Sequence, residues 1–201
     1  MQILVVPKEK VLENVIANNG SDPDSFYDFV NKSGLFMERE DAEKDPAYLQ
    51  IIPYIIVSRN EKVFLYTRLK KGNESRLHGN LSAGIGGHVD FLEGSPLSNK
   101  ETIIHNTTKE LHEELNITTF GDPVLYNYTG HLIYDSSNDV GRVHLGMLMT
   151  CDLSTKEVSV REKDKIDGEF YSLDEIRNIY SESKDRFENW TSIAFNKLGM
   201  V

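Results

Sequence analysis

The sequence predicts an α+β domain in which helices lie on both sides of a mixed β-sheet. The β-rich runs 50–58 (QIIPYIIVS) and 62–69 (KVFLYTRL) are joined by a short polar turn, which is the pattern of a hairpin. Residues 99–115 have helical spacing of apolar side chains, and further β-rich runs follow them. Strands that occur both before and after a helix, with hairpins among them, favour a mixed sheet.

The expected elements follow in chain order. A short strand is expected at 3–6 and a helix near 25–36. The hairpin described above follows, and residues 81–91 then predict a strand, a glycine turn and a second strand. Residues 124–134 and 143–153 predict strands, 169–180 a strand leading into a helix, and 183–198 a last helix. Residues 1–45 mix helical and loop signals, so we expect an N-terminal appendage (1–45) packed on a main domain (46–201).

Composition narrows the class of protein. The chain has 201 residues and a formal charge of −10, which argues against a general nucleic-acid binder or a protein of anionic membranes. Cys151 is its single cysteine, so no intramolecular disulfide forms, as is usual in a reducing compartment. Neither a signal peptide nor an apolar run of about 20 residues is visible. These observations predict a cytoplasmic protein.

The run 109–117 (KELHEELNI) extends a helix with a clear start signal. Ser98 and Glu101 form the S-x-x-E pattern of a capping box. We expect the side chains of Ile104, Leu111 and Leu115 to face the core, and Asn116 to end the helix.

Glu110, Glu113 and Glu114 fall on one flank of this helix, where like charges are mildly destabilising unless water or a cation compensates them. A solvated acidic face is one interpretation. The preceding glycine cluster, which includes Gly84, Gly86 and Gly87, favours another, because carboxylates and a close backbone carbonyl are the ligands of a hard divalent cation.

These segments resemble the Nudix hydrolase motif G-x5-E-x7-R-E-U-x-E-E-x-G-U, where U is a bulky aliphatic residue. Residues 109–117 match its second half, with Lys109 for Arg and Asn116 for Gly. Gly87 and Glu93 have the spacing of the first half, whereas Glu101 has the x7 spacing to Lys109. The resemblance covers about residues 50–180 and is strongest to bacterial and phage members described as predicted phosphoesterases.

The connection between the two half-motifs is longer than usual, so either Glu93 or Glu101 takes the place of the first motif glutamate. The x7 spacing favours Glu101. On a helical wheel Glu101 lies about 180° from Glu110. We therefore expect it to pair with Lys109 rather than to bind the same ion.

The resemblance implies a Nudix fold and a Mg²⁺- or Mn²⁺-dependent hydrolase of a phosphoanhydride in a small-molecule, nucleoside diphosphate-linked substrate. Glu110, Glu113, Glu114 and the Gly86 carbonyl would be metal ligands, with Gly87, Glu101 and Lys109 supporting the motif. Glu113 and Glu114 would also be catalytic. A general base comes from a later segment, and Glu162 is favoured over Asp164 and Glu169. Arg68 and Arg76 are the candidates for phosphate binding, and homodimers are common in the family.

Other interpretations predict different outcomes. A Nudix-fold binding or regulatory module without turnover would usually lack motif glutamates, and a prenyl diphosphate isomerase would need a reactive cysteine where Cys151 reads as buried. An unrelated module with an acidic helix would not respond to divalent cations. His88 reads as a turn cap or substrate contact, and His78, His112 and His144 share no spacing, so a zinc site is not expected. The physiological substrate stays open.

Overall fold

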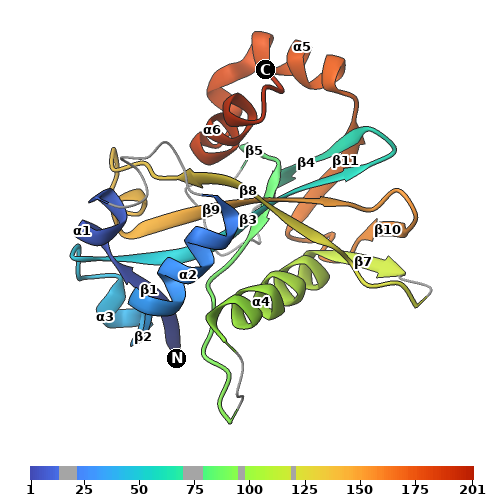
Figure 1. Ribbon diagram of the computed structural model, residues 1–201. Coiled ribbons are helices and arrows are strands. Elements are labelled where there is room, and N and C mark those ends of the chain that lie inside the picture. The colour runs from blue at the N-terminus through green and yellow to red at the C-terminus, as the bar shows by residue number, and fades with distance from the viewer. Residues whose placement is uncertain (14–21, 70–78, 95–97, 119–120) are drawn as a thin grey trace. The chain divides into compact units, whose positions relative to one another are not determined.

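The computed structural model describes residues 1–13, 22–69, 79–94, 98–118 and 121–201 (Figure 1). The chain divides into two compact units made of discontinuous segments. Unit 1 comprises Met1–Tyr54, Gly86–Thr108 and Tyr128–Met149, and unit 2 comprises Ile55–Ile85, Lys109–Asn127 and Thr150–Val201. The fold is α+β, as predicted, with a large β-sheet and helices.

Most helices and strands belong to a single unit. Unit 1 holds β1 (Gln2–Pro7), α1 (Lys8–Val11), α2 (Pro23–Ser33), β2 (Leu35–Glu38), α3 (Arg39–Ala42) and the 3₁₀ turn η3 (Gly141–Val143). Unit 2 holds β4 (Lys62–Arg68), β5 (Leu81–Ser82), β7 (Leu115–Thr118), β10 (Glu157–Val160), β11 (Ile166–Tyr171), α5 (Leu173–Ser183), η4 (Lys184–Arg186) and α6 (Asn189–Lys197). Five elements contribute residues to both units: β3 (Tyr48–Arg59), β6 (Gly84–Gly86), α4 (Asn99–Glu114), β8 (Tyr126–Ile133) and β9 (His144–Asp152).

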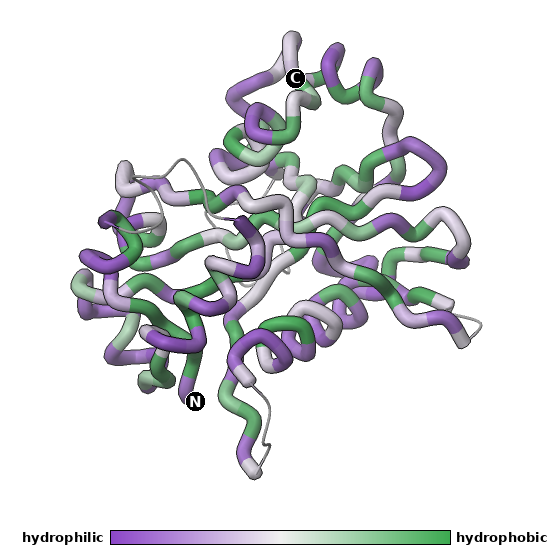
Figure 2. Tube along the Cα trace, in the orientation of Figure 1, coloured by the Kyte–Doolittle hydropathy of each residue, from purple (hydrophilic) through white to green (hydrophobic). Residues whose placement is uncertain are grey.

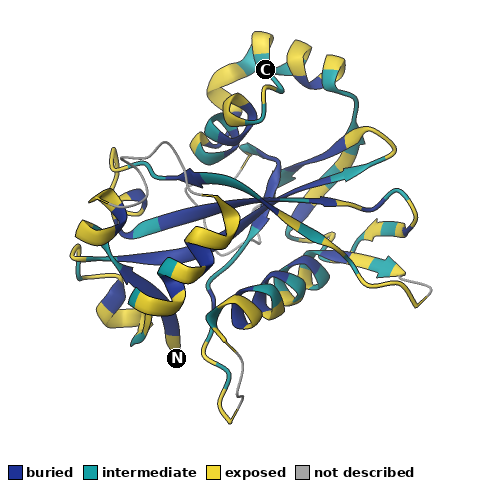
Figure 3. Cartoon of the chain, viewed as in Figure 1, coloured by how far each residue is buried: buried dark blue, intermediate teal, exposed yellow. Residues whose placement is uncertain are grey.

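In unit 1, strand β1 pairs antiparallel with β2 on one side and with the start of β3 on the other. Ile3 and Val5 are fully buried and pack with Ala42, so β1 lies in the core of this unit, as its dark colour in Figure 3 shows. Burying an aliphatic side chain of this size contributes about 1.5–3 kcal/mol. Residues on both sides of position 45 thus pair within unit 1, and the predicted boundary there stays a prediction.

In unit 2, strand β4 pairs antiparallel with β11 and with the end of β3. Asn60 and Glu61 form the hairpin turn between β3 and β4, with φ of 50° and 62°. Positive φ at both central residues is the requirement of a tight two-residue hairpin whose twist matches that of its strands. The predicted hairpin is confirmed.

The register of β4 on β11 sets which side chains share a face. Ile166 lies opposite Arg68 and Gly168 opposite Tyr66. The Phe64 ring is 5.6 Å from the Tyr66 ring, centroid to centroid. A Cβ on Gly168 would come within 2.6 Å of both the Phe64 ring and the Tyr66 Cβ. A side chain at this position would therefore force the Phe64 ring or the strand at Tyr66 to shift.

Helix α4 begins with the predicted capping box: the Glu101 carboxylate accepts hydrogen bonds from the Ser98 backbone N–H and hydroxyl, at 2.8 and 2.9 Å. Figure 2 shows hydrophobic and hydrophilic residues alternating around its turns. Leu111 and Leu115 are buried as expected, but Ile103 is buried in place of Ile104. The reason is that the buried face also contains polar residues, namely Thr102, Asn106 and Thr107.

Some expected boundaries were wrong. The chain passes from α4 directly into β7, so Asn116 lies in a strand and does not end the helix. After the glycines at 86–87 only an isolated bridge, Ile3 to Asp90, replaces the second strand expected in 81–91. Within the described residues, none of the helices is long and apolar enough to cross a membrane.

Candidate active site

The last turns of α4 present the three motif glutamates in unit 2 with different exposures. The Glu113 side chain is 52% exposed and the Glu110 side chain 21% exposed, and the Lys109 ammonium lies 3.9 Å from a carboxylate oxygen of each. Glu114 is the most enclosed: its Oε2 atom is buried and has no hydrogen-bond partner among the described residues. A buried carboxylate oxygen without a partner is costly, so this atom is a candidate contact for a ligand.

The charge environment of Glu114 is unusual. Burial is the main cause that raises the pKa of this carboxyl to about 7, and the Arg68 guanidinium opposes it. The negative charges of Glu110, Glu162 and Glu188 raise the same pKa further. Several carboxylates therefore act on one enclosed carboxyl, and a perturbed carboxyl of this kind is typical of functional sites.

Arg68 stands opposite these carboxylates, at the end of β4. Its Nε donates to the Glu188 carboxylate at 2.8 Å, and its NH2 nitrogen (Nη2) donates to the Tyr66 hydroxyl at 3.1 Å. The Tyr66 hydroxyl in turn donates to the Gly84 carbonyl at 2.8 Å. Arg68 is thus held on two sides, with a quarter of its side chain exposed (24%), and it is not a loose surface cation.

Glu188 was missed by the sequence reasoning. Its side chain is buried, and its backbone N–H donates to the Leu81 carbonyl at 2.9 Å, which fixes it beside β5. It stands just before α6, far from the motif in sequence, and its type and spacing carry no signal of a role. Its contact with Arg68 forms only when folding brings β4 and the start of α6 together.

The loop after β10 carries Glu162. The backbone N–H of Arg161 donates to the Glu114 carbonyl at 2.8 Å, so this loop is tied to the end of α4. The Glu162 carboxylate accepts from the Lys165 ammonium at 2.6 Å and its charge acts on Glu114. Of the three later acids that the sequence offered, Glu162 is the one whose charge is among the causes of the Glu114 shift.

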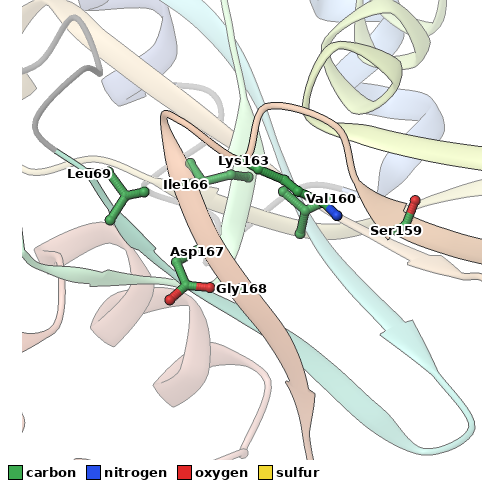
Figure 4. Close-up of a pocket in the computed structure, with 7 residues that line it drawn as sticks. All are labelled: Leu69, Ser159, Val160, Lys163, Ile166, Asp167 and Gly168. Carbon is green, nitrogen blue, oxygen red and sulfur yellow. The ribbon is translucent and has the colours of Figure 1, made fainter.

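A cavity of about 520 Å³ opens beside the same loop (Figure 4). Leu69, Val160 and Ile166 give it an apolar part, and Ser159, Lys163 and Asp167 a polar part; Gly168 completes the lining. The cavity thus lies between the end of β4, the end of β10 and the start of β11.

The remaining predicted residues lie in unit 1 or outside the described residues. Gly86 ends β6, where a Cβ would collide with the Pro53 carbonyl oxygen, so the close backbone approach predicted for this glycine is to β3. Gly87 follows it. The Glu101 carboxylate accepts hydrogen bonds from Ser98, which lower its pKa, and its pairing with Lys109 stays a prediction. Arg76 lies outside the described residues.

The carboxylates of unit 2 are oxygen ligands of the kind that a hard divalent cation prefers. Glu114 offers an unpartnered buried oxygen, and neighbouring negative charges make an added positive charge favourable. In the described part of the chain, no three His, Cys, Asp or Glu side chains are already gathered closely enough to enclose an ion. Glu110, Glu113 and Glu114 nevertheless share one flank of one helix, so a common ion can draw them together by side-chain rotation alone.

Cys151 gives no sign of reactivity. Its side chain is 2% exposed, and burial, together with the charge of Asp152, raises the pKa of its thiol to about 12. A thiol in this environment stays protonated and unreactive. The isomerase interpretation, which needs a reactive cysteine, is therefore not supported.

Known proteins are similar to this chain over most of its length. No protein-family model matches the chain. Protein YmaB of Bacillus subtilis (strain 168) is 41% identical over 165 residues, which are 81% of this chain and 77% of YmaB. The crystal structure of Tm1382, a proposed Nudix hydrolase, matches all of both chains with a TM-score of 0.79 and 28% identity.

A bifunctional NMN adenylyltransferase/ADP ribose pyrophosphatase from Francisella tularensis gives a TM-score of 0.50 over 75% of this chain and 40% of its own. At 18% identity this last likeness concerns the fold alone.

Proposed function

Because the chain belongs to the Nudix hydrolase family, we propose that it hydrolyses a phosphoanhydride in a nucleoside diphosphate-linked or related substrate, with Mg²⁺ or Mn²⁺. A Nudix-type hydrolase of acid anhydrides is the class that the family gives. The observation that carries the finer proposal is the unpartnered, buried Oε2 of Glu114 among acting carboxylate charges.

Glu110, Glu113 and Glu114 would hold the metal, together with the Gly86 carbonyl that the family resemblance adds. When bound, a divalent cation neutralises phosphate charge and lowers the pKa of water, so that hydroxide is available near neutral pH. Carboxylates are the oxygen ligands that Mg²⁺ and Mn²⁺ prefer.

Other residues of the chain would accept the proton of the attacking water and bind the phosphates. Glu162, whose loop is tied to the end of α4, would accept a proton from the attacking water at its carboxylate. Arg68, held by Glu188 and Tyr66, would orient the anionic phosphates without having to be ordered at the moment of binding. Arg76 would also contact the phosphates. The cavity beside β11 would bind the leaving group of the substrate, which carries a phosphate.

The test is a hydrolysis assay with matched variants. Purified protein is incubated with Mg²⁺ or Mn²⁺ and a panel of nucleoside triphosphates, dinucleoside polyphosphates, nucleotide sugars and non-nucleotide diphosphates. Release of phosphate or nucleoside monophosphate is measured for the wild type, Glu114→Gln and the control Glu182→Gln, whose residue is exposed on α5. We expect release that EDTA abolishes, that Glu114→Gln lowers by at least 100-fold, and that Glu182→Gln leaves unchanged.

Two results would contradict the proposal. Turnover that survives Glu114→Gln would show that the α4 carboxylates do not carry the reaction. Nucleotide binding without turnover of any compound would favour the binding module. Glu162→Gln, compared with Asp164→Asn and Glu169→Gln, then assigns the base: loss of kcat in the first variant alone supports Glu162.

A further inference from the structure

Two histidines that are 56 residues apart in sequence meet in unit 1. The Nε2 atom of His144 lies 3.4 Å from the Nε2 atom of His88, and their ring centroids are 5.4 Å apart. His144 is the first residue of β9, and His88 lies in the loop that follows β6. No sequence spacing reveals this pair, since each histidine is on a different element.

The orientation of His144 is fixed from behind. Its Nδ1 lies 2.6 Å from the Val140 carbonyl oxygen, so Nδ1 carries the proton and donates it. The lone pair of Nε2 then points toward His88. A histidine that ligates a metal nearly always donates its other ring N–H to a carbonyl or carboxylate in this way.

A buried amide completes the cluster. Gln50 on β3 is fully buried, and its Oε1 lies 2.8 Å from His88 Nε2. Its Nε2 has no hydrogen-bond partner among the described residues. Burying an unpaired amide N–H is energetically unfavourable. An oxygen ligand at this position, such as a metal-bound water, would supply the missing acceptor.

We propose that His88 and His144 are paired ligands of a borderline transition-metal ion such as Zn²⁺, with Gln50 lining the same site. Two nitrogens bound at about 2.0–2.1 Å to one tetrahedral ion are about 3.4 Å apart. The Nε2 atoms of His88 and His144 already have this separation, 3.4 Å. The separation of the two nitrogens therefore matches that of two ligands of one tetrahedral ion.

Binding of the metal ion releases no proton from the two histidines. Before binding, the His88 Nε2–H donates to Gln50 Oε1, and His144 Nε2 is an acceptor. Binding moves the His88 proton from Nε2 to Nδ1, so that both Nε2 lone pairs face the ion and each ring keeps one proton. An ion about 2.0–2.1 Å from His88 Nε2 takes the place of the hydrogen bond to Gln50 Oε1, 2.8 Å away, so the Gln50 side chain turns to admit it.

This site differs from the α4 carboxylates in donor chemistry. Imidazole nitrogens suit Zn²⁺, Ni²⁺ and Cu²⁺, whereas Mg²⁺ prefers oxygen and keeps its waters. An ion here would join β3, the loop after β6 and the start of β9, all within unit 1. Its expected effect is stabilisation of that unit, and the proposal does not depend on hydrolysis.

The test measures metal binding to chelator-treated protein in excess Mg²⁺, by calorimetry with Zn²⁺ and by visible absorption with Co²⁺. We expect one Zn²⁺ per chain and a Co²⁺ spectrum with the intense bands of a tetrahedral site. His88→Ala and His144→Ala should each weaken Zn²⁺ binding at least tenfold. The control His105→Ala, an exposed histidine on α4, should bind as the wild type does. Zn²⁺ should also raise the Tm of the wild type but not of the two variants.

Several outcomes would overturn the proposal. They are absence of Zn²⁺ binding by the wild type, equal binding by the histidine variants, weak octahedral Co²⁺ bands, or loss of Zn²⁺ binding in Glu114→Gln. The last would assign the ion to the carboxylates. Should the alanine variants fail to fold, His144→Phe keeps the ring without its nitrogens, and the wild-type Co²⁺ spectrum decides independently.

Discussion

At the residue scale, the enclosed carboxyl of Glu114 makes the metal-free protein sensitive to pH. Its folded-state pKa of about 7 lies above the ordinary value of 4.5, mainly because of burial. Between these values the folded chain binds more protons than the unfolded chain. The contribution of Glu114 to stability is therefore full below pH 4.5 and is lost as the pH rises through about 7.

Glu114→Gln should remove this loss, because a neutral amide has no proton to give up. In EDTA, the variant should gain stability relative to the wild type between pH 5 and pH 8, by on the order of 2–3 kcal/mol. Urea unfolding at the two pH values measures the difference. Glu113→Gln is the matched control for the loss of one carboxylate from the same helix, since its side chain is 52% exposed. Equal slopes for Glu114→Gln and wild type would rule out the enclosed carboxyl as the cause.

At the element scale, Gly168 decides how β4 lies on β11. Gly168→Ala places a Cβ 2.6 Å from both the Phe64 ring and the Tyr66 Cβ, in a tightly packed part of the strand pair. We expect a loss of about 2–3 kcal/mol, as for other overpacked sites. Displacement of Tyr66 should also loosen Arg68 and raise KM. The neighbouring variant Asp167→Ala, at an exposed position, should leave the unfolding midpoint in urea nearly unchanged.

Two helices begin with the same kind of cap, so variants of the two caps can separate an effect on stability from an effect on activity. Ser98 caps α4, which carries the motif glutamates, and Ser172 caps α5 with the same box formed by Glu175. Each Ser→Ala change should cost about 1 kcal/mol of stability. Ser98→Ala should in addition lower kcat, whereas Ser172→Ala should not. Thermal unfolding and the hydrolysis assay together check this, and an equal loss of kcat in both variants would show a general effect of destabilisation.

The fold was predictable at the level of elements that a single pattern specifies. The β3–β4 hairpin and the capping box of α4 follow from local sequence, and both are confirmed. The short strands β7 and β10 were missed because each is only four residues long and gains its pairing from the other. Ile104 was misplaced because Thr102, Asn106 and Thr107 are buried polar residues that an apolar count does not register.

The candidate site was predictable in part for the same physical reason. Glu110, Glu113 and Glu114 are neighbours on one helix, so their spacing reveals them. Glu188 contacts Arg68, and His144 lies against His88, across sequence separations of 120 and 56 residues. Contacts of this kind arise from folding and leave no local pattern.

At the scale of the whole molecule, the charge of −10 predicts a response to salt. Raising NaCl from about 10 mM to 150 mM shortens the screening length from about 30 Å to 8 Å. Repulsion between like charges in the folded chain then weakens, so the Tm of the metal-free protein should rise by a few degrees.

Scanning calorimetry at the two salt concentrations measures this shift. A double variant of exposed residues, Glu9→Gln with Glu182→Gln, should show a smaller rise. A Tm that falls with salt would mean that surface ion pairs outweigh the repulsion.

The turn at Asn60 and Glu61 constrains more than its own hairpin. Exposed loops usually accept insertions and deletions, and this turn is exposed. However, the turn fixes the register of β4, and a shift of one residue moves every side chain of a strand to the opposite face. Arg68 and Tyr66 would then exchange faces with Thr67. Over evolutionary time the length of this surface loop is therefore constrained, and its two central positions favour residues that tolerate positive φ.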